Sequence, residues 1–134
     1  MAFVTDYVTL PGLVAASNLA SSQYLVGKLA STAGKVAAAG TLNSTTNPGA
    51  FVGVIMNKPA ADEEVEFAID GIVKAIAATS TIAVGDRVYS NSTGRLTDAG
   101  TTDNGFFLGR ALEAATAAGD IITIKLAGNG GGRY

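Results

Sequence analysis

Hydrophobic and polar positions follow the two-residue period of β-strands in several short segments of the chain. Residues 65–69 (VEFAI) place apolar side chains at alternate positions, so we expect one face in a core and the other in water. Residues 51–56 (FVGVIM) are apolar at nearly every position, as in a strand that is buried on both faces. Turns rich in Gly, Pro, Asn and Asp separate such segments, which indicates many short strands.

The pattern predicts a mainly β chain, folded as an antiparallel β-barrel or sandwich. Asp70-Gly71 is a hairpin-turn signal between two of the expected strands. About nine or ten strands at this spacing are typical of barrels and sandwiches. Residues 111–118 and 62–66 are short helical alternatives, the first because it is rich in Ala. The expected strands are residues 23–29, 35–38, 51–56, 65–69, 72–77, 87–90, 95–97, 106–112 and 121–126.

Two phrases occur twice along the chain. GKVAAAG at 34–40 returns as GRLTDAG 60 residues later, and GAFVG at 49–53 returns as GFFLG 56 residues later. The difference in spacing falls in the connecting loop, where length variation is best tolerated. We interpret the pattern as an internally duplicated β unit, with approximate repeats at 23–70 and 83–127. Coincidence in a chain rich in Gly and Ala is the alternative.

The two ends of the chain differ from this β unit. Residues 1–22 carry apolar and aromatic side chains around a Pro-Gly break and have no clean period. We expect an extended N-terminal arm here, and two interpretations stay open: the arm packs on a neighbouring molecule, or it is an edge strand of the same barrel. Residues 23–127 form the single β domain, and residues 128–134 form a flexible Gly-rich tail.

Composition removes several classes of function. The chain of 134 residues has neither Cys nor His, so disulfides, thiolate chemistry and the commonest general base and metal ligand are absent. A net charge of −2 without a basic stripe gives little support for nucleic-acid binding, and no apolar run approaches a membrane span. We therefore expect no catalytic residues, no cofactor and no metal. The densest charge, in residues 62–66, is expected to be a solvated turn or to face a basic partner.

Four successive segments resemble the small capsid decoration, or cement, proteins of tailed bacteriophages. They are SSQYLVGKL, GAFVGVIMNKPAADEEVEFAIDGIVKA, TIAVGDRVYSNSTGRLTD and GFFLGRALEAATAAGDIITIKL, and the resemblance runs from about Ser21 to Leu126. It implies a β-rich protein without enzymatic activity, located on the outer surface of the virion capsid. It further implies a homotrimer at three-fold and quasi-three-fold positions that binds the major capsid protein and stabilises its lattice.

Contact residues cannot be carried over by motif, so we predict them from the sequence. The expected capsid contacts lie in the arm: Phe3, Val4, Tyr7, Val8, Leu10, Leu13 and Val14. Deletion of residues 1–16 is expected to abolish capsid binding while a folded core remains. Phe106 and Phe107 are expected at the trimer interface, because adjacent residues of a regular strand cannot face the same core.

Two alternatives stay open, one a different role in the virion and the other from another class of protein. The first is a head-fibre or tail module that binds a host surface. The second is a small β-barrel enzyme that uses carboxylates, which would require a pocket joining Asp62, Glu64 or Asp86 with a lysine.

Overall fold

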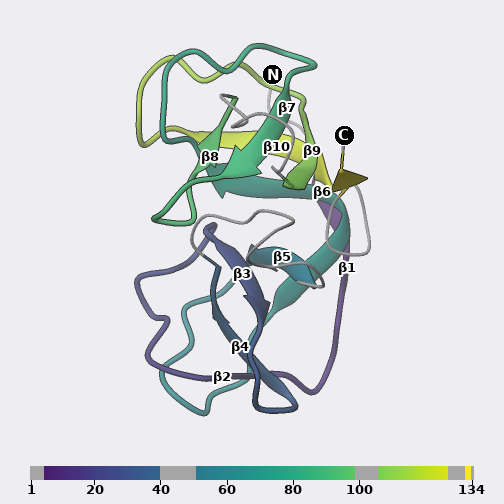
Figure 1. The fold of residues 1–134 in the computed structure, drawn as a ribbon, viewed down its shortest axis with the longest axis vertical. Helices are drawn as coiled ribbons and strands as arrows, with labels where there is room; N and C mark the ends of the chain where they lie inside the picture. The colour runs from purple at the N-terminus through teal and green to yellow at the C-terminus, as the bar shows by residue number, and fades with distance from the viewer. Residues whose placement is uncertain (1–4, 40–50, 99–105, 127–131, 134) are drawn as a thin grey trace.

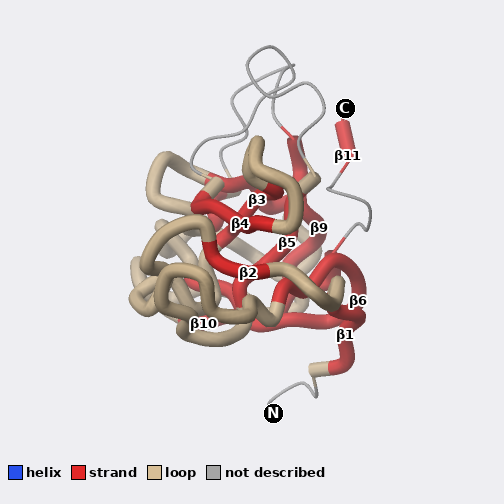
Figure 2. The backbone as a smooth tube through the Cα atoms, turned by 90° about the horizontal axis from the view of Figure 1, so that it is seen from below, coloured by secondary structure: helices blue, strands red, loops and turns tan. Residues whose placement is uncertain are grey.

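Strands and turns make up the described part of the chain, which contains no helix (Figure 2). In the computed structural model, the described residues are 5–39, 51–98, 106–126 and 132–133. The strands are β1 (Asp6–Thr9), β2 (Val14–Ala15), β3 (Val26–Leu29), β4 (Lys35–Ala38), β5 (Val52–Ile55), β6 (Phe67–Ile76), β7 (Arg87–Ser90), β8 (Leu96–Thr97), β9 (Phe106–Ala111), β10 (Ile121–Leu126) and β11 (Gly132–Arg133).

These strands form one 11-stranded sheet around the long strand β6. The order is β2-β4-β3-β5-β6-β10-β9-β7-β8, with β1 paired to β6 and β11 paired to β9. Every strand pair is antiparallel except β2 with β4. β6 bends through the molecule, so that β2 to β5 lie in its lower half and β7 to β10 in its upper half (Figure 1). The expectation of a mainly β, largely antiparallel fold is confirmed.

The expectation of a closed barrel is wrong, because the sheet does not close. Its two end strands, β2 and β8, are each two residues long. Each end strand also contacts a residue that flanks β6, through a single isolated bridge. These bridges are Val14–Glu64 for β2 and Ala77–Leu96 for β8. Strands this short cannot form the continuous ladder that a closed barrel requires.

The expected hairpin at Asp70-Gly71 is also wrong, since both residues lie inside β6. Here β6 is held from both sides: Gly71 pairs with Tyr7 of β1 and with Leu126 of β10. Gly71 has φ of 99°, and a Cβ on it would lie 2.7 Å from the Cα of Tyr7. Glycine at position 71 therefore allows the backbone of β1 to approach β6 closely, and it does not form a hairpin turn. The helical alternatives at 111–118 and 62–66 are turns and irregular backbone.

The two halves of the chain pair their strands in the same order. The first half has β4-β3-β5-β6 and the second has β8-β7-β9-β10, all antiparallel. Ala15 of β2 pairs in parallel with Val36 of β4. In the second half, Ala77, which follows β6, forms a parallel bridge with Leu96 of β8, so Ala77 takes the place that β2 has in the first half.

The register also corresponds between the halves. Gly53 and Gly109 close the phrases GAFVG and GFFLG, and they are paired with β3 and β7 respectively. A Cβ on Gly53 would collide with the carbonyl oxygen of Ala68, and a Cβ on Gly109 would collide with that of Lys125. Ala68 and Lys125 themselves occupy matching places, because they pair with Val54 and Arg110, the next residues after these glycines.

Backbone hydrogen bonds follow the same correspondence. Tyr24 has φ of 65° and donates its N–H to Ile55 O at 2.6 Å, and Gly85 has φ of 90° and donates to Ala111 O at 2.8 Å. Three further bonds from a backbone N–H to a carbonyl oxygen occur in both halves. In the first half they are Ala16 to Val36, Met56 to Glu66 and Asp62 to Ala15, and their counterparts in the second half are, in the same order, Ala78 to Leu96, Leu112 to Thr123 and Gly119 to Ala77. The halves thus share strand order, register and turn conformations.

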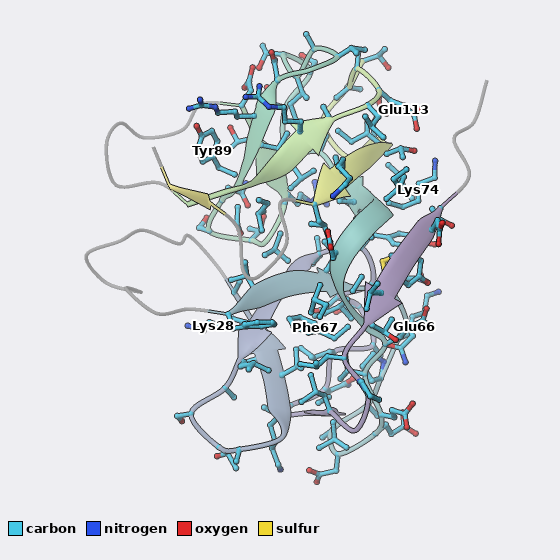
Figure 3. The ribbon with its side chains drawn as sticks, turned by 90° about the vertical axis from the view of Figure 1, so that its right-hand side faces the viewer. Lys28, Glu66, Phe67, Lys74, Tyr89 and Glu113 are labelled. Atoms are coloured by element: carbon cyan, nitrogen blue, oxygen red, sulfur yellow. The ribbon has the colours of Figure 1, made fainter. Side chains whose placement is uncertain are left out.

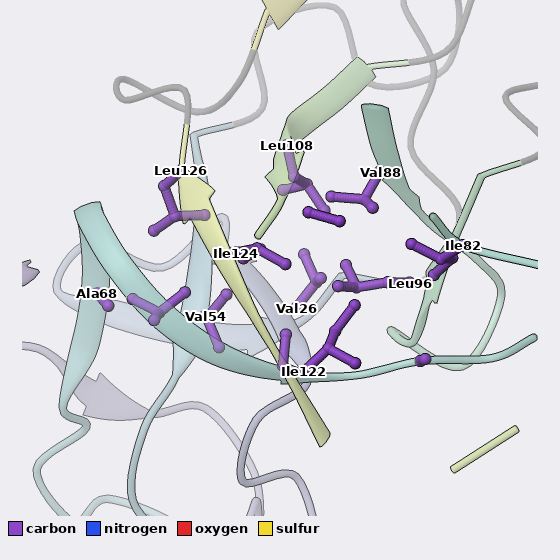
Figure 4. Close-up of a cluster of buried hydrophobic side chains, with 14 of the residues drawn as sticks. Val26, Val54, Ala68, Ile82, Val88, Leu96, Leu108, Ile122, Ile124 and Leu126 are labelled. Atoms are coloured by element: carbon purple, nitrogen blue, oxygen red, sulfur yellow. The ribbon is translucent and has the colours of Figure 1, made fainter. Parts of the chain in front are cut away.

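Two buried clusters stabilise the sheet. The smaller cluster fills the first half around Phe67, which is fully buried, and includes Val36, Ile55 and Val65 (Figure 3). The larger cluster fills the second half and extends over the first: Val26, Val54 and Ala68 pack among the side chains of β10 (Figure 4). Residues of the first half therefore cover the interior of the second.

The described part of the N-terminal segment does not extend away from the domain. β1 pairs with β6, and β2 pairs with β4. Leu13 is 7% exposed, and Ala15 is fully buried. Of the two interpretations left open by the sequence, β1 and β2 fit the edge strand, although the sheet to which they belong is open rather than a barrel. Because deletion of residues 1–16 would remove Leu13 and Ala15 from the core, that variant cannot keep an intact core as expected.

Candidate functional site

One exposed face of the sheet collects side chains from β1, β6, β10, β9 and β7, and we call it the outer face. Residues paired directly across antiparallel strands place their side chains on the same face. Asp6, Ile72, Lys125, Arg110 and Arg87 form such a line across all five strands. With the alternate residues of the same strands, the outer face comprises Asp6, Val8, Asp70, Ile72, Lys74, Ile76, Arg87, Arg110, Ile121, Thr123 and Lys125. The opposite side of β6 and β10 is core.

Three cations stand side by side at one end of the outer face. Lys125 of β10 pairs with Arg110 of β9, which pairs with Arg87 of β7, and all three residues are exposed. We call them the basic row. Like charges directly opposite each other on a sheet are destabilising. The Arg110 Nη1 donates a hydrogen bond to the carbonyl oxygen of Gly85 at 3.0 Å.

Asp70 lies beside the basic row. The Lys125 Nζ is 3.1 Å from its Oδ1. This hydrogen bond, together with one from the backbone N–H of Gly71, holds the pKa of the Asp70 carboxyl below its ordinary value. Both side chains of this ion pair are about half exposed (51% and 53%), so we expect little stability from it.

A polar group occupies the middle of the outer face. The Lys74 Nζ donates to Thr123 Oγ1 at 2.6 Å and lies 3.3 Å from Glu113 Oε1 (Figure 3). The Thr123 hydroxyl and backbone N–H both donate to the same oxygen of Glu113. The bond from the hydroxyl is the main reason that the pKa of Glu113 is lowered, against the effect of desolvation. Thr123 is fully buried beneath these charges, so the group fixes β10 against β6.

Two large apolar side chains are exposed on the outer face. Val8 of β1 is 58% exposed and Ile121 of β10 is 50% exposed. Val8 and Arg87 lie at opposite ends of the outer face, because β6, β10 and β9 lie between β1, which carries Val8, and β7, which carries Arg87. Within the described strands, β1 pairs only with β6, so its other edge presents backbone groups next to Val8.

The capsid contacts expected from the sequence fall in different environments. Val8 is exposed and Leu13 is buried. Tyr7 is half-buried against the larger cluster and donates its hydroxyl to Glu66, whereas Leu10 packs on the smaller cluster. Val14 is half-buried in β2. Phe3 and Val4 lie outside the described residues, as do the side chains of Phe106 and Phe107, whose backbone belongs to β9. Of the expected capsid contacts that lie among the described residues, Val8 alone lies on the outer face.

The carboxylates of the enzyme alternative do not converge. Asp62 lies 2.7 Å from Lys35 at the surface of the first half, and its side chain is 74% exposed. Asp86 accepts a hydrogen bond from the backbone N–H of Ala83 in the turn before β7. Among the residues that the structure describes, no group of three or more acidic side chains could hold a metal ion. The described part of the chain also has no helix that could cross a membrane.

The outer face was missed by sequence reasoning. Arg87, Arg110 and Lys125 are far apart in the sequence, and their alignment depends on the register of three strands. A weak signal exists in the repeat itself. The matching positions of the first half are Val26, Val54 and Ala68, which are buried, so the second half replaces an apolar row by cations.

A solved structure shares this fold. The head fibre gp8.5 N base of bacteriophage phi29 matches with a TM-score of 0.59 over 98% of this chain and 100% of that chain, at 17% sequence identity. No curated protein matches the chain.

The sequence profile of the phage cement proteins matches residues 20–126. This match covers most of the chain, including β3 to β10 and the whole of the basic row. It agrees with a structural, non-enzymatic protein on the outer surface of a virion capsid, as the resemblance implied. The chain belongs to the phage cement protein family.

Proposed function

We propose that this protein decorates the head of a tailed phage as a homotrimer at three-fold and quasi-three-fold sites. There it binds the major capsid protein and stabilises the lattice of the shell. The observation that carries the proposal is the family match over residues 20–126. The outer face supports it, since it offers a broad exposed surface.

We infer that β1 is the element that contacts the shell. Among the expected contacts that the structure describes, Val8 is the one exposed on the outer face, and the edge of β1 beside it can accept a further strand. A modest contact is sufficient, because many identical copies on a shell gain affinity through avidity.

The internal duplication belongs to the same proposal. Matching strand order, matching register and matching positive-φ positions support two copies of one β unit per chain. A trimer would then contain six similar units around one axis, and Gly53 and Gly109 would serve the same close approach in each copy.

A second candidate function is the base of a head fibre. The observation in its favour is the fold shared with the phi29 head fibre N base, which spans almost all of both chains. In that role the protein would attach to the head in the same way and carry a further module that binds a host surface.

The test uses undecorated heads and purified protein. Binding is measured by co-sedimentation, and shell stability by the temperature at which heads release their DNA. We expect saturable binding and a higher release temperature. Val8→Asp would bury a charge in the contact and weaken binding by about tenfold or more. Val84→Asp is the matched control, because Val84 is 68% exposed but lies in the turn before β7. Equal binding of Val8→Asp and wild type would exclude β1 as the contact.

A further inference from the structure

The side chains of the basic row are not part of the hydrophobic core, whereas the matching positions of the first half are. Val26, Val54 and Ala68 hold the matching positions in the first half, and each is fully buried. They are covered by the second half, among Ile122, Ile124 and Leu126 (Figure 4). The same surface of the unit is therefore a contact between units inside the chain.

In the second half, this surface stays exposed and carries Arg87, Arg110 and Lys125. Cations suit a contact between separate chains, because each chain must remain soluble before it assembles. Within the molecule, Lys125 already faces the carboxylate of Asp70, whereas the guanidinium of Arg110 donates to the backbone carbonyl oxygen of Gly85. A partner that supplies carboxylates would therefore add a charged acceptor at Arg110. A chain with a net charge of −2 holds such carboxylates itself.

The densest carboxylates lie in the other half. Asp62, Glu63 and Glu64 form an exposed turn between β5 and β6, and we call it the acidic turn. It is part of the loop at the lower left of Figure 1, whereas β7, β9 and β10 occupy the upper half. Asp62 already contacts Lys35 at 2.7 Å, so Glu63 and Glu64 carry most of the remaining charge. Because the acidic turn and the basic row lie in different halves of the molecule, a contact between them is favoured between two chains rather than within one.

We propose that the basic row of one molecule binds the acidic turn of a second copy. Such a contact joins two different surfaces, so it is head-to-tail, and it closes into a ring when the rotation between copies allows it. This inference rests on the proposed homotrimer and names the surfaces that form it. The central pair is Arg110 with Glu64 of the neighbour.

The absence of natural cysteine makes a direct test possible. Chains carrying Arg110→Cys are mixed with chains carrying Glu64→Cys and oxidised, both in solution and on undecorated heads. We expect a disulfide-linked dimer in the mixture and a ladder up to three chains for the double variant. Thr93→Cys, an exposed position in the turn between β7 and β8, is the control and should give no mixed product with Glu64→Cys.

Charge reversal gives an independent readout by light scattering at several salt concentrations. Arg110→Glu and Glu64→Lys should each raise the dissociation constant of the assembly by about tenfold or more, and the double variant should recover most of the loss. Lys58→Glu is the matched control, as an exposed cation outside both surfaces.

The outcomes separate this inference from the proposed function. No mixed disulfide in solution or on heads, with head binding intact, would overturn the basic-row contact and leave the decoration role standing. An Arg110→Glu variant that assembles normally but no longer binds heads would also overturn it, and would assign the row to the shell. Failure of the wild type to bind heads would instead contradict the proposed function.

Discussion

Gly71 of β6 and Tyr7 of β1 are direct partners across two strands, and their backbones are so close that a Cβ on Gly71 would lie 2.7 Å from the Cα of Tyr7. The same glycine has φ of 99°, a conformation that other residues rarely adopt. The contact holds the N-terminal strand against the centre of the sheet. Residues 6–9 of the segment expected as an arm are thereby paired within the sheet.

Gly71→Ala should lower the free energy of unfolding by about 3 kcal/mol, because strain in φ adds to a collision with the backbone of β1. Chemical denaturation measures this loss. Gly85→Ala is the matched control: Gly85 also has positive φ, but a Cβ there meets nothing within 4 Å. Its loss should be near 1 kcal/mol, from the conformational strain alone. Equal losses for both variants would show that the close approach of β1 contributes nothing.

Gly53→Ala and Gly109→Ala should destabilise the protein by similar amounts, about 2 kcal/mol or more each. In both variants the new Cβ would press on a backbone carbonyl, of Ala68 or of Lys125, which cannot move away without breaking strand pairing. Thermal unfolding of both variants checks this. Gly27→Ala is the comparison, because its Cβ would meet mainly the movable side chain of Ile55 at 3.1 Å and should cost less. If Gly53→Ala lowered the stability and Gly109→Ala did not, the two glycines would not be structurally equivalent, which would contradict the correspondence of the halves.

Glu113 makes stability depend on acid pH. Its pKa is lowered in the folded state from 4.5, mainly by the hydrogen bond from Thr123 and also by Lys74. A lowered folded pKa means that the stabilisation is present above pH 4.5 and is lost as the pH falls through the folded value. Wild type should therefore lose more unfolding free energy than Glu113→Gln between pH 5 and acid denaturation. Parallel pH profiles for the two proteins would contradict this role.

Tyr7 makes stability depend on alkaline pH. Its hydrogen bond to Glu66 raises the pKa of Tyr7 from 10.0 to about 12, because the neutral phenol is the donor and the carboxylate repels the phenolate. The raised pKa means that the stabilisation is present below pH 10 and is lost as the pH rises toward 12. The phenolate absorbance should show a late component that Tyr7→Phe removes. Glu66→Gln keeps an acceptor without the charge, so it should move this component toward pH 10.

The positions of the strands could be predicted because they depend on local pattern. Residues 35–38, 87–90 and 121–126 were predicted with the bounds that the structure has. The role of Asp70-Gly71 could not be predicted, because a Gly after Asp has the same local signature in a hairpin and at a close strand approach. The difference lies in Tyr7 and Leu126, which are distant in the sequence and hold Gly71 from both sides.

The candidate site was predicted less well for the same reason. Apolar residues of the N-terminal segment look alike in the sequence, but Leu13 faces the core and Val8 faces solvent. Their orientation depends on the pairing of β1 with β6 and on the shift in register between Val8 and Thr9. The basic row likewise appears only when β7, β9 and β10 are aligned.

The most direct test of the decoration role is a cryo-electron microscopy reconstruction of undecorated heads incubated with this protein. The account predicts three copies around each three-fold and quasi-three-fold axis on the outer surface, with β1 against the shell. Density as single copies, at the five-fold vertices alone, or on the tail would contradict it.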